Sequence, residues 1–512
     1  MKKKLSEPEA LTRRKVLKGV GAALGAAAAG CGGGGDDGGT PGAGGGGAGG
    51  VGGGGGTGPG GGGGGAGGSG GGVAGSGGQG GGGGAGPDRC GDEGGLSAAE
   101  LLAPIETIVV LCMENRSFDH YLGALRLVEG RAVDGLTGLE SNADARGAPV
   151  APFGLLDFTV ADPPHDWDAA HAQWNNGRND GFVKAHAGPA EREVMGYHVR
   201  EQLRALYALA DASAVCERWF CSLLGPTWPN RLYLHGATSL GSDGNTPVFG
   251  FTSVFELLDA AGVTHRNYFH DVPWCAGAYF KTGGLSGIDT FFEQASAGTL
   301  PAFSIIDPQF FGAGANDDHP DHDIQLGQAL IGAVYNALAL GPQWGKCLFV
   351  LTYDEHGGFF DHVPPPTTVD ERPAFAQLGF RVPSLVAGPF VRRGCAVSRQ
   401  LEHVSVIKTL TTRFGLPSLN GRVDATNDLS CCIDPAALAD PHPPVTLPPT
   451  TVSLSRLRAR ARRPRAPHHP EIWAAAEGGL IPRHLDRRRE GDAITRRVLE
   501  HAVRLGAVRL IE

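Results

Sequence analysis

Two stretches far apart in the chain are continuously apolar and end in acidic or amide side chains. Residues 105–115 read IETIVVLCMEN, and residues 346–355 read KCLFVLTYDE. A strand covered on both faces needs such an unbroken apolar run, whereas a half-exposed strand alternates apolar and polar residues. Both stretches are therefore predicted to be buried strands of a mostly parallel sheet.

Two other stretches repeat apolar residues with the period of a helix. Residues 200–220 place Leu203, Leu206, Tyr207 and Leu209 on one face, and residues 323–340 show the same spacing. Strands that alternate with helices indicate an α/β fold, in which helices cover both sides of a central sheet.

The ends of the two predicted strands carry the first candidate site. In such sheets ligands bind outside the carboxyl ends of strands, where Glu114 and Asn115 follow one strand and Asp354 and Glu355 follow the other. A single acidic strand end would be interpreted as a loop acid or a helix cap. Buried carboxylates without a partner are costly, so two matching ends favour a shared metal ion.

A third stretch, CSLLGPTWPNRLYLHGATS at residues 221–239, supplies a candidate nucleophile. Gly225 and Pro226 enforce a turn, and Thr227 is expected at the exposed start of a helix. Its hydroxyl has two interpretations. The first is a helix cap. The second is a nucleophile whose pKa is lowered by a cation. The unpaired backbone N–H groups at the same helix start would suit a phosphate oxygen.

Histidines lie near these stretches. They are His165 in DPPHDWD, His319 in NDDHPDHD, His356 in DEHGG and His362 in FDHVPPP. Taken alone, each histidine is more often a surface or structural residue than a catalytic one. Gly357 and Gly358 are expected to let the backbone turn tightly beside the ion.

Composition divides the 512 residues into four parts. Of the 84 glycines, most fall before residue 88, in a segment without the apolar surface that would offset the entropy of ordering. We therefore expect a signal peptide at residues 1–31, a disordered linker at 32–100, a packed domain that contains the candidate site at 101–449 and an arginine-rich, helical extension at 450–512.

The first part resembles a twin-arginine export signal, LTRRKVLKGVGAALGAAAAGC, and is too short and glycine-rich to span a bilayer. AAGC also resembles a lipoprotein box with Cys31 as the acylated residue; the alternative is a plain cleaved signal. The sequence thus predicts export by the machinery for folded proteins, and a lipid-anchored envelope protein or a periplasmic or secreted one.

The last part has two interpretations. Its arginines either meet anionic lipid or another envelope partner, or they cover a solvated helical extension that packs on the domain, and the second is favoured. The formal net charge of −9 gives no indication of nucleic-acid binding.

Ten cysteines in an exported chain permit disulfides, and none has the spacing of zinc ligands. Cys112 and Cys347 are expected to be buried thiols because they lie at the ends of apolar runs. The candidates for disulfides are Cys216, Cys221, Cys431 and Cys432.

These motifs together resemble one family. MENRSFDHYLG, YALADASAVCERWFCSLLGPTWPNRLYLHGATS, FSIIDPQFFGAGANDDHPDHDIQLGQAL, LTYDEHGGFFDHVPPP and GFRVPSLVAGPFVRRG are similar to the bacterial phosphoesterases that include non-haemolytic phospholipases C and acid phosphatases. The resemblance spans roughly residues 105–416 and implies a fold like that of alkaline phosphatase.

The resemblance also implies roles for individual residues. The metal ligands would be Glu114, Asn115, Asp354, Glu355 and Thr227, with Thr227 as the nucleophile that forms a phosphothreonine intermediate. His319 would donate a proton or contact phosphate, His165 would contact phosphate, and Asn115, His356 and His362 would line the substrate pocket. Oxygen ligands favour a hard divalent cation such as calcium, magnesium or manganese.

The implied activity is that of a phospholipase C, which releases diacylglycerol and a phosphorylated headgroup. Threonine at position 227 resembles the phospholipase branch, whereas the arginine-rich tail departs from the β-rich C-terminal domains of larger members. Two alternatives stay open: an acid phosphatase acting on soluble phosphomonoesters, and a non-catalytic envelope-binding protein.

Overall fold

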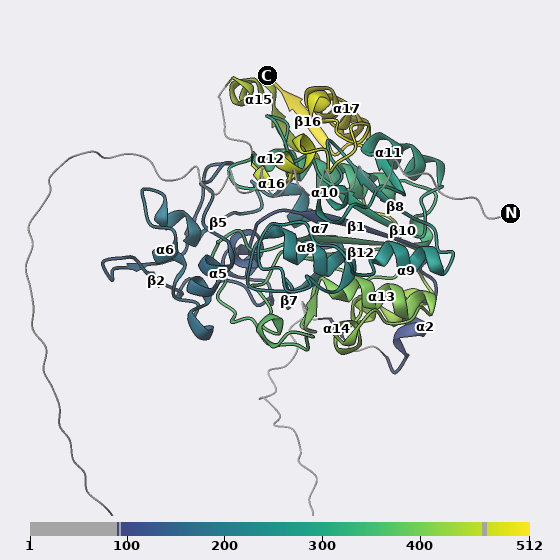
Figure 1. Ribbon diagram of the computed structural model, residues 1–512, viewed down its shortest axis with the longest axis horizontal. Coiled ribbons are helices and arrows are strands. Elements are labelled where there is room, and N and C mark those ends of the chain that lie inside the picture. The colour runs from purple at the N-terminus through teal and green to yellow at the C-terminus, as the bar shows by residue number, and fades with distance from the viewer. Residues whose placement is uncertain (1–89, 92–93, 463–467) are drawn as a thin grey trace, which may run out of the picture.

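The computed structural model describes residues 90–91, 94–462 and 468–512 (Figure 1). The predicted signal peptide, Cys31 and nearly all of the predicted linker lie outside the described residues. No helix within the described ranges is long and apolar enough to cross a membrane.

A sheet of eight strands forms the centre of the molecule, in the order β13-β6-β12-β11-β1-β10-β8-β9. β12 is antiparallel to both of its neighbours, and the other adjacent pairs are parallel. The strands are β1 (Thr107–Met113), β6 (Ala214–Cys216), β8 (His265–Phe269), β9 (Leu285–Gly287), β10 (Phe303–Asp307), β11 (Cys347–Tyr353), β12 (Leu385–Ala387) and β13 (Cys395–Val397).

The two apolar runs are neighbouring strands in the middle of this sheet. All seven residues of β1 and all seven of β11 are buried, and the strands pair in register from Thr107 opposite Cys347 to Met113 opposite Tyr353. The prediction of a mostly parallel sheet with buried central strands is confirmed. Because the strands are parallel and in register, their acidic ends lie side by side.

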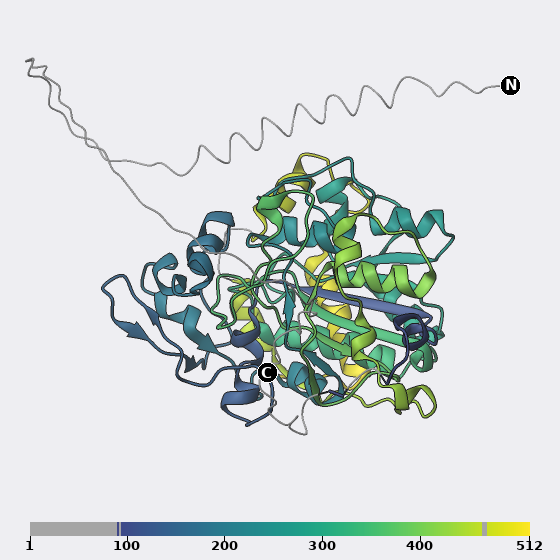
Figure 2. The same cartoon turned by 90° about the horizontal axis from the view of Figure 1, so that it is seen from below.

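Helices cover both faces of the sheet (Figures 1 and 2). α11, α12 and α17 lie on one side, and α8, α9 and α13 lie on the other. The helices in chain order are α2 (Ala98–Leu102), α3 (Phe118–Leu122), α4 (Ala124–Leu127), α5 (Trp167–Trp174), α6 (Phe182–Ala185), α7 (Arg204–Ala212), α8 (Thr227–Gly236), α9 (Val254–Ala260), α10 (Trp274–Tyr279), α11 (Ile288–Ala297), α12 (Ile324–Ala339), α13 (Val404–Phe414) and α14 (Gly421–Ala425).

Short strand pairs lie outside the main sheet. They are formed by β2 (Asn142–Ala143), β3 (Pro149–Val150), β4 (Phe153–Gly154), β5 (Gly196–Tyr197), β7 (Trp219–Phe220) and β14 (Leu401–Glu402).

The C-terminal extension, residues 450–512, packs on the same body. It contains β15 (Thr450–Ser453), α15 (Leu454–Ala461), α16 (Pro470–Glu477), α17 (Gly491–Arg504) and β16 (Val508–Ile511). β15 and β16 pair in parallel. Asn336 of α12 joins the extension to the domain by three hydrogen bonds. Its Nδ2 donates to the carbonyl oxygens of Leu447 and Leu505, and its Oδ1 accepts from the Leu447 N–H.

The structure corrects the expected disulfides. Cys90 and Cys395 form a disulfide that ties the start of the described chain to β13. Cys112 and Cys347 are buried thiols, as predicted. The four proposed partners are also buried free cysteines. The sulfurs of Cys216 and Cys432 lie 3.8 Å apart, a contact without a covalent bond.

Candidate active site

Three carboxylates converge at the carboxyl ends of adjacent parallel strands. Glu114 follows β1, Asp354 follows β11, and Asp307 is the last residue of β10. All three side chains are completely buried. Burial raises the pKa of Glu114 to about 8 and that of Asp354 to about 6, which is the expected response of a carboxyl group removed from water.

The guanidinium of Arg231 lies among these carboxylates. Its Nη2 is 2.8 Å from Glu114 Oε1, its Nε donates to Asp354 Oδ2 at 3.0 Å, and its Nη1 is 3.7 Å from Asp307 Oδ1. The sequence analysis did not identify Arg231. The sequence contained a clue to Arg231. It lies four residues after Thr227 in the predicted helix, and residues four apart share one face of a helix.

Thr227 is the first residue of α8, but its hydroxyl does not cap the helix. The N-cap is Pro226, without a side-chain cap hydrogen bond, and Asn245 Oδ1 accepts from the N–H of Trp228. Thr227 and the rest of α8 are buried, whereas the sequence predicted an exposed start of the helix. The Thr227 hydroxyl instead donates to Asn115 Oδ1 at 3.4 Å.

Asn115 connects the nucleophile candidate with the strand ends. Its backbone has φ 57°, a left-handed conformation that asparagine tolerates better than most residues. The backbone N–H donates to Asp354 Oδ1 at 3.1 Å, and Nδ2 lies 3.2 Å from His165 Nε2. Asn115 thus lies between Thr227, Asp354 and His165, and its predicted contacts with an ion and a substrate stay predictions.

The loop after β11 approaches the loop after β1 closely. A Cβ at Gly357 would lie 2.1 Å from the carbonyl oxygen of Asn115, and the Gly357 backbone has φ 64°. The Gly357 N–H donates to Glu355 Oε2 at 2.6 Å. Glycine is required here for both reasons, and the tight turn fixes Glu355 next to Asn115.

The imidazoles of His165 and His319 face the same site, with ring centroids 5.9 Å apart. His165 Nε2 lies 3.8 Å from Glu355 Oε1. Burial lowers the pKa of an imidazole, but the carboxylates of Glu355 and Asp162 outweigh burial and raise the pKa of His165 to about 9. Burial and the neighbouring His469 lower the pKa of His319 well below its ordinary value.

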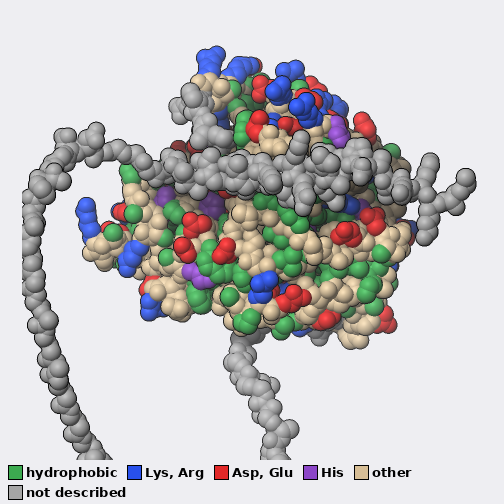
Figure 3. Space-filling view, viewed as in Figure 1, with side chains coloured by type: hydrophobic (Ala, Val, Ile, Leu, Met, Phe, Trp, Pro, Cys, Tyr) green, Lys and Arg blue, Asp and Glu red, His purple; other side chains and the backbone are tan. Residues whose placement is uncertain are grey.

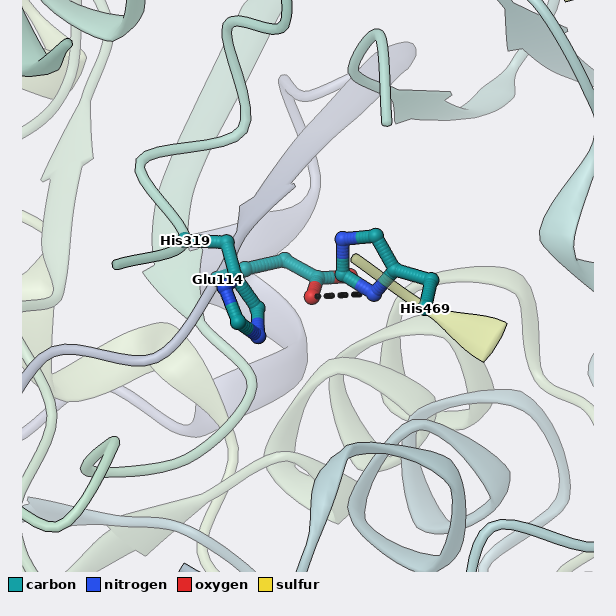
Figure 4. A group of neighbouring side chains, drawn as sticks. All are labelled: Glu114, His319 and His469. Carbon is teal, nitrogen blue, oxygen red and sulfur yellow. Dashed lines mark ion pairs between the residues drawn. The ribbon is translucent and has the colours of Figure 1, made fainter. Parts of the chain in front are cut away.

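The C-terminal extension contributes His469, a residue that the sequence analysis missed. Figure 4 shows Glu114, His319 and His469 pointing toward one another. His469 Nδ1 is 3.4 Å from Glu114 Oε2, and its Nε2 lies 3.0 Å from Asp317 Oδ2. These carboxylates outweigh burial and raise the pKa of His469 to about 9.

Local backbone structure holds His469 in place. It occupies the N-cap position of α16 in a left-handed conformation, directly before Pro470, whose ring suits the first helical position. Ile472 and Ala475 of α16 pack in an apolar cluster with Trp274 of α10. The fold of the extension therefore fixes the imidazole in the interior.

The donor atoms fit a cation. Both carboxylate oxygens of Glu114, Oε1 of Glu355 and Oδ1 of Asp307 are buried without a hydrogen-bond partner among the described residues, although Glu114 ion-pairs with Arg231 and His469. The structure also groups donor atoms that could hold a metal ion in two sets: Glu114 with His319 and His469, and Asp162 with His319 and His468.

The remaining predicted pocket residues lie differently. His356 is buried, with Nδ1 3.2 Å from Glu355 Oε2 and Nε2 2.7 Å from Gln173 Oε1, so it contacts a predicted ligand. His362 instead belongs to an ion-pair network with Asp119, Asp134 and Arg381. Its role as a substrate contact stays a prediction.

Comparison with known proteins shows the class to which this fold and site belong. The sequence model of the phosphoesterase family matches residues 105–417, and the chain belongs to that family. It is therefore a phosphoric ester hydrolase, and the resemblance seen in the sequence is confirmed.

Two relatives illustrate the similarity. Non-specific phospholipase C3 of Arabidopsis thaliana is 36% identical over 381 residues, which are 64% of this chain and 72% of the relative. Phospholipase C B of Mycobacterium tuberculosis strain H37Rv is 32% identical over 435 residues, 70% of this chain and 82% of the relative. A solved structure of a Vibrio parahaemolyticus protein in the alkaline phosphatase superfamily aligns with a TM-score of 0.30 and 12% identity, covering 64% of this chain and 70% of that one.

Replacing Arg231 by methionine is expected to lower the free energy of unfolding by about 3–5 kcal/mol, because it leaves buried carboxylates without their cation. The measurement is urea unfolding in the presence of a chelator. Arg218→Met, at an arginine whose side chain is 40% exposed, should change stability by less than about 0.5 kcal/mol. Equal losses in the two variants would contradict the assigned role of Arg231.

Replacing His469 by alanine is expected to reduce activity or metal affinity about 10- to 100-fold, because the residue holds Glu114 and Asp317 in place. Steady-state kinetics and metal titration measure the two effects separately. His484→Ala, at an exposed histidine of the same extension, is the matched control. Wild-type kinetics and metal affinity in His469→Ala would remove His469 from the site.

His362 allows a test by pH. Asp119 outweighs burial and raises the pKa of His362 to about 10. Protonated His362 contributes its full stabilisation at pH values below the pKa of about 6.5 that histidine has in the unfolded chain. This stabilisation is lost as the pH rises toward the folded pKa of about 10. His362→Ala should therefore lower Tm more at pH 6 than near pH 10. An equal loss of Tm at both pH values would contradict the network.

Proposed function

We propose that the protein is an exported, metal-dependent phospholipase C that uses Thr227 as its nucleophile. The observation that supports this most directly is the position of the Thr227 hydroxyl. It lies at the buried start of a helix and donates to Asn115. The backbone N–H of Asn115 donates in turn to the Asp354 carboxylate that follows β11. The similarity to phospholipases C supports a phospholipid as the substrate class.

The residues present suit attack on a phosphodiester. The Thr227 oxygen forms a bond to phosphorus while the bond from phosphorus to the glycerol oxygen breaks, which gives phosphothreonine and diacylglycerol. In this proposal the neutral imidazole of His319 takes up the proton that the Thr227 hydroxyl loses and gives it to the departing alcohol. His165 contacts phosphate oxygens. Water then hydrolyses the phosphothreonine, releases the phosphorylated headgroup and restores the hydroxyl.

Glu114, Asn115, Asp354, Glu355 and Thr227 are the residues proposed to hold the divalent ion. When bound, such an ion lowers the pKa of a hydroxyl and neutralises phosphate charge. The oxygen donors favour calcium, magnesium or manganese. Unpartnered buried oxygens of Glu114 and Glu355 support a cation at this place.

Export and anchoring rest on the sequence. The arginine pair followed by a weakly apolar run supports the twin-arginine route, and Cys31 before a glycine-rich segment supports a lipid anchor in the membrane. The disulfide between Cys90 and Cys395 suits an oxidising compartment. We therefore propose a cell-envelope lipoprotein.

The decisive experiment compares Thr227→Ala with wild type on phosphatidylcholine vesicles, with and without a chelator. Because Thr227 supplies the attacking oxygen, its removal should lower kcat/KM about 1,000-fold or more. Thr227→Ser keeps a hydroxyl and should retain measurable turnover. The assay measures release of phosphocholine and diacylglycerol.

Two results would contradict the proposal. Hydrolysis of p-nitrophenyl phosphate without release of diacylglycerol from any lipid would assign an acid phosphatase. Full activity in Thr227→Ala, or in the presence of chelator, would overturn the nucleophile or the metal dependence respectively.

A further inference from the structure

Positive charge is concentrated in the C-terminal extension. Residues 450–512 contain 14 arginines and seven acidic residues, a net charge of +7, although the whole chain carries −9. The first 449 residues therefore carry −16. A basic segment on an otherwise acidic protein indicates a surface with its own partner.

Among the described residues, several of these arginines are exposed on one part of the surface. In Figure 3 the Lys and Arg side chains gather where α15, α17 and β16 lie, at the top of the view. The side chains of Arg456 and Arg458 are 42% and 60% exposed, and Arg496 and Arg509 are exposed as well. Arg458 pairs with Glu512, but acidic residues are too few to neutralise the segment.

An apolar groove of about 550 Å³ runs between α15 and α17. Leu454, Leu457, Leu499 and Leu510 supply its apolar lining, and its rim carries two arginines and two acidic residues. Beside the groove, Leu510 and Ile511 of β16 are 39% and 45% exposed. Exposed aliphatic side chains among arginines are typical of surfaces that lie on a lipid bilayer.

The basic surface borders the active site. Arg460 of α15 donates to the carbonyl of Asp321 at 3.0 Å, and Arg456 lies 3.8 Å from Asp323. Asp321 and Asp323 belong to the loop that carries His319. The extension also supplies His469, which contacts Glu114 in the candidate site. A partner bound to α15 would therefore lie close to the candidate site.

We propose that the face formed by α15, α17 and β16 docks onto an anionic lipid bilayer. The arginines meet the negative headgroups, while Leu510, Ile511 and the groove meet the apolar boundary beneath them. Nucleic acid offers the same charge, but only a bilayer offers a partner for the apolar side chains. The choice of a bilayer rests on the proposed function, because a phospholipid substrate lies in a membrane.

The test measures binding of the full chain carrying Cys31→Ser, so that an acyl anchor cannot contribute. Vesicles of phosphatidylcholine with and without phosphatidylglycerol are sedimented with the protein at increasing salt. Stronger binding to the anionic vesicles that weakens with salt is expected. Equal binding to both kinds of vesicle, or to neither, would overturn the proposal without any variant.

The triple variant Arg458→Gln/Arg496→Gln/Arg509→Gln should lower partitioning onto anionic vesicles about 100-fold, because each arginine near such a surface contributes roughly fivefold. The matched control removes three exposed arginines elsewhere, Arg146→Gln/Arg178→Gln/Arg192→Gln, and should bind like wild type. Equal effects of the two triple variants would show that only overall charge matters, which contradicts a docking face.

A second variant tests the apolar contact. Leu510→Ser/Ile511→Ser keeps every charge and should weaken vesicle binding while leaving binding to double-stranded DNA unchanged. Two results would overturn bilayer docking and assign a general polyanion-binding surface. One is a double serine variant that binds both vesicles and DNA like wild type. The other is displacement of the protein from vesicles by DNA at equal phosphate concentration.

Hydrolysis of soluble p-nitrophenylphosphorylcholine separates docking from catalysis. Both arginine variants should hydrolyse this substrate like wild type, whereas hydrolysis of anionic vesicles should fall only in Arg458→Gln/Arg496→Gln/Arg509→Gln. If wild type hydrolyses no phosphodiester, the proposed function fails, but the sedimentation result still decides the docking face.

Discussion

The burial of several like charges at one edge of a parallel sheet is the constraint around which the site is organised. Glu114, Asp307 and Asp354 are brought together because β1, β10 and β11 are adjacent and parallel, and removing them from water is costly without a counter-charge. Arg231 supplies that charge from α8. The helix that carries Arg231 also begins with Thr227, so the same helix neutralises the carboxylates and positions the proposed nucleophile.

Backbone geometry then fixes the distances inside the site. The left-handed Asn115 turns the chain immediately after β1, and Gly357 allows the loop after β11 to touch it. Backbone N–H groups of both loops donate to Asp354 and Glu355, so Asn115, which accepts from Thr227, is held next to these carboxylates. Such rigidity is what a site needs when it acts by orientation and electrostatic stabilisation.

Local patterns predicted much of this arrangement, and long-range contacts account for what they missed. Continuous apolar runs identified β1 and β11, and the residues that follow them include the buried acids Glu114 and Asp354. Asp307 escaped notice because its strand was not recognised, and His469 because the histidine lies in a segment of different composition, far along the chain. The disulfide pairing was also missed, since no pattern in a sequence reveals that residue 90 returns to β13.

His469 extends the candidate site beyond the region that matches the family model. The region that matches the family model ends at residue 417, yet His469 contacts Glu114 and packs against His319 with ring centroids 4.7 Å apart. Part of the active site is thus built by a segment outside the shared region. A substitution at His469 would alter the contacts of Glu114 and His319 directly, because its imidazole touches both side chains. The surroundings of Glu114 and His319 therefore depend on a residue outside the region that matches the family model.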